Sequence, residues 1–356
     1  MWCPHLPLTH LQNALMSLQT LSVDVNGTAK LAFNDSGNPG NNNYITIFAV
    51  HGMGWNNRIF KRVQTLSAAK SIRIVAVNRR QYKGSTPYTE SEAMIPITGS
   101  DEEKANFIKS RGVELANFID TFIQNNQLPP ISDDGKTGGV ALLGWSAGNL
   151  ITAAAIANLD ALSDASKKRL KSHLRGHIMQ EPPSIAFGLP LPAANWSPHM
   201  DTTIPADKQA AMFTTWITSY FDHGDLSTRD VNVLSYIVPS AFRPPTIYDM
   251  TPEEIAETAD QGPVELPGMF MSMAQSNAVY RKACYSADIK SLVPSLKTTF
   301  ITGDATCSYS LAALWSIQDD NKAEKGNIKF VVIPGANHFW HWDDAEEALK
   351  TYAESL

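Results

Sequence analysis

Apolar residues along the chain fall into short runs rich in β-branched residues, and longer segments with apolar residues at helical spacing separate these runs. A short apolar run bounded by turn residues is typical of a buried strand. Alternation of such strands with helices predicts an α/β fold, a mostly parallel central sheet with helices on both faces. The expected strands are YITIFAV (44–50), SIRIVAV (71–77), GGVALLG (138–144), GHIMQ (176–180), KTTFITG (297–303) and IKFVVIPG (328–335). The expected helices lie near 57–70, 107–122, 147–159, 309–323 and from about 343.

An antiparallel hairpin is expected before the first parallel strand. LSVDV (21–25) and AKLAF (29–33) alternate apolar and polar residues, and Asn26-Gly27 lies between them. An Asn-Gly pair readily adopts the positive φ angles of a tight hairpin turn. The sheet is therefore expected to begin with two antiparallel strands.

Residues 182–291 interrupt the alternation of strands and helices. The segment is divided by prolines, is rich in aromatic residues and methionines, and contains no further run typical of a parallel strand. We expect a core domain formed by residues 1–181 and 292–356, with a helical cap inserted at 182–291. Long insertions tend to lie over functional sites, although a helical appendage that packs elsewhere would give the same pattern.

Composition and charge exclude several classes of function. The net charge of -6 argues against a nucleic-acid partner. No segment has the length of a membrane span, and residues 1–20 lack the basic leader and sustained apolar stretch of a secretory signal. Cys3, Cys284 and Cys307 are odd in number and lack metal-binding spacing. We expect a cytoplasmic protein that binds no metal and no membrane.

Ser146 is the candidate nucleophile. The motif Gly144-Trp145-Ser146-Ala147-Gly148 follows an expected buried strand and opens an expected helix. Gly-x-Ser-x-Gly arises easily by chance, but this context is the one that a nucleophile elbow requires. The alternative is a small residue in a tight turn.

A serine nucleophile needs a base and a site that stabilises the oxyanion. His338 lies in the loop after the last expected strand, from which an imidazole can reach the serine, and His341 is the rival base. The loop His51-Gly52-Met53-Gly54 follows the strand 44–50. We expect N–H groups near Gly52 or Met53, together with that of Ala147, to bind the oxyanion; the alternative is an ordinary glycine turn.

Four segments together resemble the α/β-hydrolase superfamily: HGMGW (51–55), NRRQYKGST (78–86), GWSAG (144–148) and PGANHF (334–339). The resemblance covers both parts of the core and not the cap. It implies the α/β-hydrolase fold with a Ser-His-acid triad. Such triads act on esters, lactones, thioesters or amides without a metal or organic cofactor.

The acid of the triad departs from the commonest family pattern, which would place it at Thr306. Asp304 lies two residues too early for that pattern. Glu181 in MQEPP (179–183) is similar to the catalytic glutamate of the zearalenone lactonases, which follows the strand after the nucleophile helix. The resemblance therefore favours Glu181 as the acid and leaves Asp304 as the alternative.

These observations predict a cofactor-free serine hydrolase that cleaves a carboxylic ester or lactone through an acyl-enzyme intermediate. The aromatic and methionine content of the cap favours a bulky, apolar small-molecule substrate. Two alternatives stay open: a C–C bond hydrolase or perhydrolase that uses the same site, and a receptor that binds a ligand with little turnover. The sequence leaves the oligomeric state unspecified. The expected substrate-binding residues are Trp145, Phe213, Trp216 and Tyr220.

Overall fold

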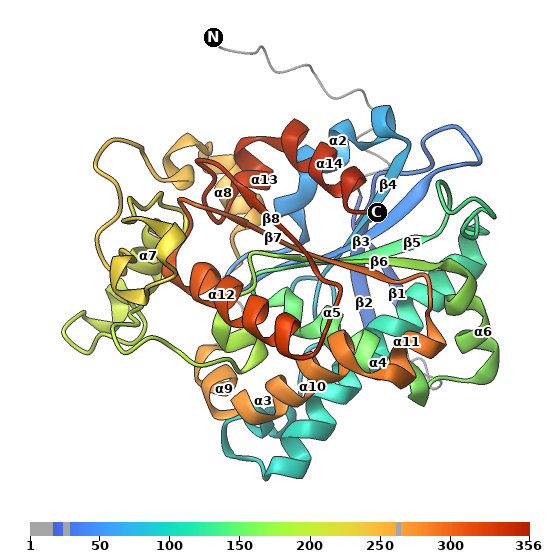
Figure 1. Cartoon of the computed structure of the whole chain (residues 1–356), viewed down its shortest axis with the longest axis horizontal. Coiled ribbons are helices and arrows are strands. Elements are labelled where there is room, and N and C mark those ends of the chain that lie inside the picture. The colour runs from blue at the N-terminus through green and yellow to red at the C-terminus, as the bar shows by residue number, and fades with distance from the viewer. Residues whose placement is uncertain (1–16, 24–28, 261–264) are drawn as a thin grey trace.

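The computed structural model of the chain describes residues 17–23, 29–260 and 265–356 (Figure 1). Within these residues, eight strands form one sheet in the order β1-β2-β4-β3-β5-β6-β7-β8. Strands β3 to β8 run parallel to one another, whereas β2 is antiparallel to both β1 and β4. The α/β-hydrolase fold expected from the sequence is confirmed. The strands are β1 (Gln19–Ser22), β2 (Lys30–Asp35), β3 (Ile45–Val50), β4 (Ile72–Val77), β5 (Val140–Trp145), β6 (Leu174–Gln180), β7 (Lys297–Gly303) and β8 (Lys329–Ile333).

The predicted hairpin is present as strands β1 and β2. Leu21 lies opposite Leu31 in the antiparallel register of the pair. The expected Asn26-Gly27 turn lies outside the described residues.

Helices cover both faces of the sheet, which explains why the central strands are continuously apolar. Successive strand residues point to opposite faces. Phe48 and Val75 therefore belong to one buried cluster, and Ile47 and Ile74 belong to the other. The first cluster packs against α4 (Asp101–Asn126), α5 (Gly148–Ala157), α6 (Asp164–His173), α10 (Met273–Tyr285), α11 (Ala287–Leu292) and α12 (Ser308–Ala323). The second packs against α2 (Lys61–Ser67), α13 (Trp340–Asp343) and α14 (Ala345–Glu354).

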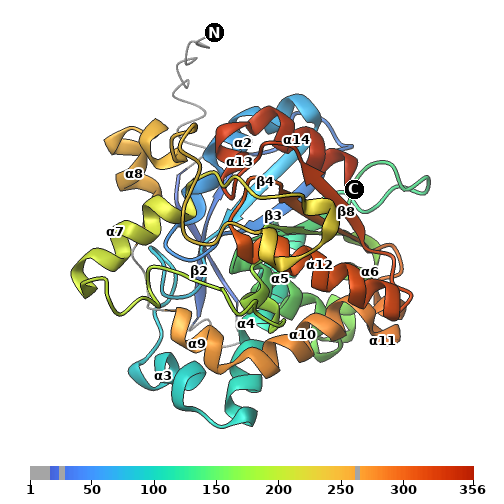
Figure 2. The same ribbon diagram turned by 60° about the vertical axis from the view of Figure 1, so that its left-hand side comes forward.

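The inserted segment divides into two structural parts. Its first part includes α7 (Ala206–Ile217), α8 (Pro252–Thr258) and α9 (Leu266–Met271), which Figure 2 shows beside the edge of the core, with α9 packed on α3 (Glu90–Thr98). Its second part, α10 and α11, packs in the core helix layer, where α10 contacts α4 and α5. The division of the chain at 182 and 291 stays a prediction. The short 3-10 helices are η1 (Asn57–Phe60), η2 (Ala68–Lys70), η3 (Leu159–Ala161), η4 (Ser184–Phe187), η5 (Leu226–Thr228), η6 (Val231–Val233) and η7 (Thr246–Asp249).

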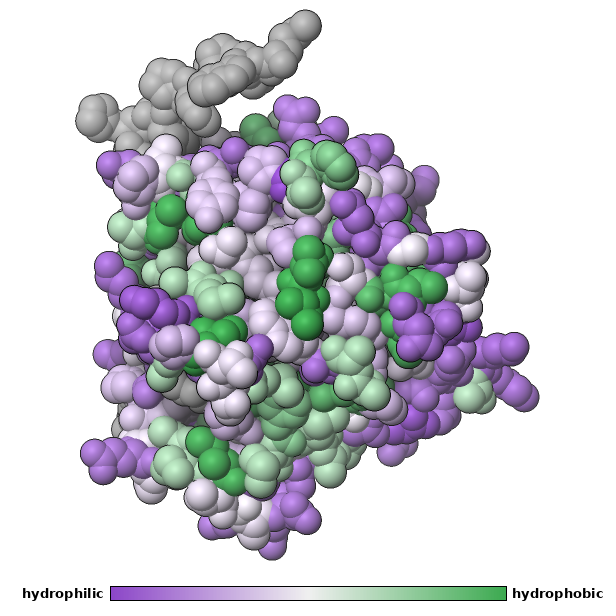
Figure 3. All heavy atoms as spheres, turned by 90° about the vertical axis from the view of Figure 1, so that its left-hand side faces the viewer, coloured by the Kyte–Doolittle hydropathy of each residue, from purple (hydrophilic) through white to green (hydrophobic). Residues whose placement is uncertain are grey.

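The surface over the inserted segment is mixed in character. Apolar side chains lie scattered among polar ones on the face shown in Figure 3. No helix in the described part of the chain combines the length and apolarity needed to cross a membrane. The exposed apolar residues of the insert include Met200, Met212, Ile237, Val238, Phe242 and Tyr248.

Gly112 lets α4 pack closely on α5. A Cβ atom at this position would lie 2.3 Å from the carbonyl oxygen of Ala154. We expect Gly112→Ala to lower the free energy of unfolding by about 1–3 kcal/mol, because overpacking forces the two helices apart. Intrinsic helix propensity predicts the opposite sign, since alanine favours a helix over glycine by about 1 kcal/mol.

Denaturant unfolding measures this difference. Ser110→Ala is the matched control, because Ser110 is exposed on the same helix, and it should change stability by about 0.5 kcal/mol or less. A Gly112→Ala protein at least as stable as the wild type would contradict the packing argument.

Candidate active site

Ser146 lies at a sharp turn between β5 and α5. Its φ angle is 54°, a left-handed conformation that is strained for a residue with a side chain. The turn leaves no room for a side chain at either flanking glycine. A Cβ atom at Gly144 would lie 2.5 Å from Thr152 Oγ1, and one at Gly148 would lie 2.3 Å from the Val50 carbonyl oxygen. The flanking glycines therefore allow the strand and the helix to meet, with Ser146 at the turn between them.

Glu181 and His338 are in direct contact. His338 Nδ1 lies 3.2 Å from Glu181 Oε2, and the two side chains are 2% and 0% exposed. The Glu181 carboxylate also accepts hydrogen bonds from the Gly303 N–H at 2.6 Å and from Thr306 Oγ1 at 2.6 Å. A third bond, from Thr302 Oγ1 at 3.1 Å, reaches the same oxygen as the Gly303 N–H. Both carboxylate oxygens are thus bonded, and one of them faces the imidazole.

Asp304 has a different position from Glu181. Its Oδ1 accepts a hydrogen bond from the Gly335 N–H at 2.5 Å and so links the loop after β7 to the turn after β8. Thr306 stands at the position where the commonest family pattern has an acid, and its hydroxyl donates to Glu181. The structure therefore brings Glu181, and not Asp304, to His338.

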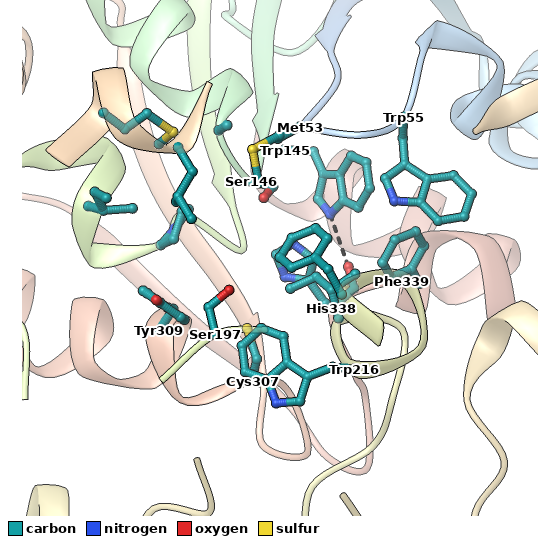
Figure 4. Close-up of a pocket in the computed structure, with 17 residues that line it drawn as sticks. Met53, Trp55, Trp145, Ser146, Ser197, Trp216, Cys307, Tyr309, His338 and Phe339 are labelled. Carbon is teal, nitrogen blue, oxygen red and sulfur yellow. Dashed lines mark hydrogen bonds between the residues drawn. The ribbon is translucent and has the colours of Figure 1, made fainter. Parts of the chain in front are cut away.

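His341, the rival base, is enclosed in the core. Burial, aided by the nearby His338, lowers the pKa of His341 to about 3. Its Nδ1 lies 2.9 Å from Gln180 Nε2, and its ring packs against Trp145. Trp145 in turn donates from Nε1 to the His338 carbonyl oxygen at 2.9 Å (Figure 4). His341 is thus a neutral core residue, and Trp145 links the serine turn to the loop that carries His338.

The loop after β3 lies directly against the serine. A Cβ atom at Gly52 would be 2.7 Å from Ser146 Cβ and 3.2 Å from Ser146 Oγ. Met53 and Ala147 line the same cavity as Ser146, and Ala147 precedes the first turn of α5, where backbone N–H groups lack partners within the helix. Gly52 thus lies against the Ser146 side chain, and Met53 and Ala147 line the cavity that Ser146 lines.

Ser146 and His338 share a small, mostly apolar cavity of about 50 Å³ (Figure 4). A larger cavity of about 430 Å³ adjoins it, with Met53, Phe213 and Leu266 in both linings. We call the small cavity the inner cavity and the larger one the outer cavity. The remaining residues that line the inner cavity are Trp55, Trp145, Ala147, Pro183, Ile185, Ser197, Trp216, Ile217, Met269, Cys307, Tyr309 and Phe339.

Three of the four expected substrate-binding residues line the inner cavity: Trp145, Phe213 and Trp216. Tyr220 is not among the residues that line this cavity, and its role in substrate binding stays a prediction. Its hydroxyl donates to Asp343 Oδ2 at 2.6 Å, as expected because a buried phenol needs a hydrogen-bond partner.

Sequence reasoning missed several residues of the cavity wall. Leu266 and Met269 come from α9, and Tyr309 comes from the first turn of α12. The only sequence signal for α9 was the cluster of methionines and phenylalanine at 269–271. This cluster indicates an apolar segment but does not indicate where the segment lies relative to Ser146. Among the described residues, no group of three or more His, Cys, Asp or Glu side chains is placed to hold a metal ion.

Comparison with known proteins decides the family. The profile of the alpha/beta hydrolase family matches residues 47–351. The chain belongs to the alpha/beta hydrolase family. No curated protein matches this alpha/beta hydrolase in sequence.

Solved structures share the fold of this alpha/beta hydrolase at low identity. A bromoperoxidase from Bacillus anthracis is 15% identical with a TM-score of 0.54, covering 94% of this chain and 98% of that chain. A laboratory-evolved variant of potato epoxide hydrolase is 14% identical with a TM-score of 0.51, covering 95% and 98%. A candidate aryl esterase from Burkholderia cenocepacia is 13% identical with a TM-score of 0.51, covering 95% and 97%.

The contact between His338 and Glu181 generates a prediction about the acid. Glu181→Gln should lower kcat toward p-nitrophenyl acetate by about four orders of magnitude, because a neutral amide cannot stabilise an imidazolium. Asp304→Asn should keep near-normal kcat and cost about 1 kcal/mol of stability, because its contact is to a turn N–H. Steady-state kinetics and thermal unfolding of both isosteric variants measure these effects. An inactive, folded Asp304→Asn beside an active Glu181→Gln would show that the acid is Asp304.

Proposed function

We propose that this alpha/beta hydrolase is a cofactor-free serine hydrolase of carboxylic esters or lactones. The observation that carries the proposal is the buried contact between His338 Nδ1 and Glu181 Oε2, at 3.2 Å, beside a cavity that Ser146 also lines. A nucleophile, a base and an acid that orients the base are the parts that acyl transfer requires. The substrate is a small molecule.

In the proposed reaction each of these groups has one role. Ser146 Oγ attacks the substrate carbonyl carbon while His338 Nε2 accepts the hydroxyl proton. Glu181 holds the Nδ1–H and stabilises the imidazolium that results. The oxyanion lies between the Met53 and Ala147 N–H groups. His338 then gives its proton to the leaving oxygen, and the acyl-enzyme is hydrolysed by water along the same path.

The two cavities favour an apolar substrate with one small and one large part. The inner cavity of about 50 Å³ is enclosed by aromatic and aliphatic side chains, whereas the outer cavity of about 430 Å³ also contains His199, Gln209 and Glu265. Apolar walls with few polar groups are typical of small-molecule sites. Cys284 and Cys307 are buried free thiols, which supports a reducing, cytoplasmic location.

Ser146 should be the serine that reacts with an active-site probe. A fluorophosphonate should label the folded protein at Ser146, because among the described serines only this one combines a left-handed turn with a histidine in the same cavity lining. Ser146→Ala should lose labelling and ester hydrolysis while its unfolding transition stays that of the wild type. Tandem mass spectrometry locates the adduct, and a panel of chromogenic esters and lactones measures turnover.

The labelling experiment also separates the alternatives. An adduct on another serine would contradict the assigned nucleophile. Labelling at Ser146 without turnover of any ester or lactone would favour a ligand-binding role, and turnover of a ketone-bearing substrate or of peroxide would favour C–C hydrolysis or perhydrolysis.

Phe213 should control the size of substrate that is accepted, because it lines both cavities. Phe213→Ala should raise kcat/KM for bulky esters relative to p-nitrophenyl acetate by about tenfold, since one truncated apolar contact is worth about 1–3 kcal/mol. Met212→Ala is the matched control on α7, because Met212 is exposed. Equal changes for both esters in Phe213→Ala would contradict this role.

A further inference from the structure

Two donors hold the carbonyl oxygen of Gly52. His51 Nδ1 lies 2.8 Å from it, and Arg79 Nη2 donates to it at 2.9 Å. His51 Nε2 accepts from the Arg79 backbone N–H at 3.2 Å, so the proton of the neutral ring is on Nδ1. Burial, together with the charge of Arg79, lowers the pKa of His51 well below 6.5 and keeps the ring neutral.

Fixing this carbonyl also fixes the Met53 N–H. A trans peptide is planar, so the Gly52 C=O and the Met53 N–H point in opposite directions. Gly52 lies against Ser146, and Met53 lines the cavity that contains Ser146. The two donors to Gly52 therefore set the direction of the N–H group that the proposed mechanism uses for the oxyanion.

The inserted segment holds Arg79 in place. Arg79 Nη1 lies 2.9 Å from Glu265 Oε2, and the two side chains are only 11% and 14% exposed. Tyr82 donates its hydroxyl to Glu265 Oε1 at 2.9 Å and accepts from Arg79 Nη2 at 3.0 Å. The guanidinium thus bridges the Gly52 carbonyl of the core and a carboxylate 186 residues away in the chain.

The same segment contacts the rest of the loop through its backbone. The Asp260 N–H donates to the Gly54 carbonyl oxygen at 3.0 Å, and the Asn56 N–H donates to the Thr258 carbonyl oxygen at 2.9 Å. Trp55 forms an isolated antiparallel bridge with Ala259. The loop after β3 is thus bordered by residues 258–260 and by Glu265.

We propose that Arg79 is a positioning residue for the oxyanion-binding Met53 N–H, and that Glu265 of the inserted segment holds Arg79 in the required position. The inference rests on the proposed serine hydrolase function. It gives the inserted segment a part in the rate of the chemical step, in addition to its part in forming the cavity walls. A misdirected Met53 N–H would bind the ground-state ester little differently, because the oxyanion is fully charged only near the transition state.

Kinetics of Glu265→Gln, Arg79→Met and Arg79→Lys test the proposal. Glu265→Gln and Arg79→Met should lower kcat toward p-nitrophenyl acetate by about 10- to 100-fold with KM changed by about twofold or less; deleting an oxyanion donor outright typically costs about 10²- to 10³-fold. Arg79→Lys should recover part of kcat, because an ammonium can still donate to the Gly52 oxygen.

Glu257→Gln is the matched control. Glu257 pairs with Lys61 at 2.9 Å and with Arg58 at 3.3 Å, so it also joins the inserted segment to the core by ion pairs. Its carboxylate makes these contacts away from Gly52, and kcat should stay within about twofold of the wild type, as expected for a half-exposed surface ion pair.

Amide hydrogen exchange of a peptide covering residues 51–56 supplies a readout that does not need turnover. Glu265→Gln and Arg79→Met should speed exchange in this peptide, whereas Glu257→Gln should not. If both variants match Glu257→Gln in kcat and in exchange while the wild type is active, the inference is wrong. A wild type that neither hydrolyses esters nor reacts with the fluorophosphonate overturns the proposed function and the catalytic part of this inference together.

Discussion

The fully buried carboxylate of Glu181 is the constraint on which the candidate site depends. A buried ion costs several kcal/mol unless hydrogen bonds satisfy its oxygens. Here the donors come from separate elements: the end of β7 supplies Thr302 and Gly303, the loop before α12 supplies Thr306, and the loop after β8 supplies His338. Satisfying one charge therefore brings the loop after β7 and the loop after β8 to the C-terminal end of β6. The position of His338 beside the cavity is a consequence of that convergence.

The ion pairs between the inserted segment and the core differ in burial. The pairs of Lys61 and Arg58 with Glu257 are 22% to 37% exposed, and such pairs contribute little to stability. The pair of Arg79 with Glu265 is mostly buried, so breaking it leaves an unpaired charge. Because Arg79 also donates to Gly52, the buried pair joins the position of the insert to the geometry of the loop beside Ser146. The inserted segment thus supplies part of the cavity wall and, through Arg79, is linked to the Gly52 carbonyl oxygen.

The sequence predicted the sheet, the core helices and the loops of the site because these features have local signals. Strands that are buried on both faces appear as continuous apolar runs, and the glycines around Ser146 mark a close approach of strand and helix. The preference for Glu181 over Asp304 came from a resemblance, and the structure places Glu181 against His338. The local pattern did not predict this contact, because 157 residues separate the two partners.

Sequence reasoning did not identify which side chains of the inserted segment line the cavity. Tyr220 was expected in the pocket as one of the aromatic residues of the inserted segment. Its hydroxyl donates to Asp343, a partner 123 residues away, and Tyr220 is not among the residues that line the inner cavity. Leu266 and Met269 lie on a helix of 6 residues. Its sequence is too short for the spacing of apolar residues to predict which side of the helix is buried. Side-chain direction in the insert is set by long-range partners that composition does not reveal.

Two of the seven described non-glycine residues with a left-handed φ, Ser146 and Glu181, belong to the proposed triad. Ser146 and Glu181 each follow a parallel strand directly, and each has a left-handed φ, 54° and 50°. A left-handed residue with a side chain costs about 1–2 kcal/mol, and neighbouring strands offset that cost. The Ser146 N–H donates to the Gln180 carbonyl oxygen at 3.0 Å, and the Glu181 N–H donates to the Ile301 carbonyl oxygen at 2.8 Å. Each sharp turn is therefore bonded to the end of the next strand in the sheet. The order β5-β6-β7 that holds the strands together also holds the nucleophile and the acid in conformations that neither residue would adopt alone.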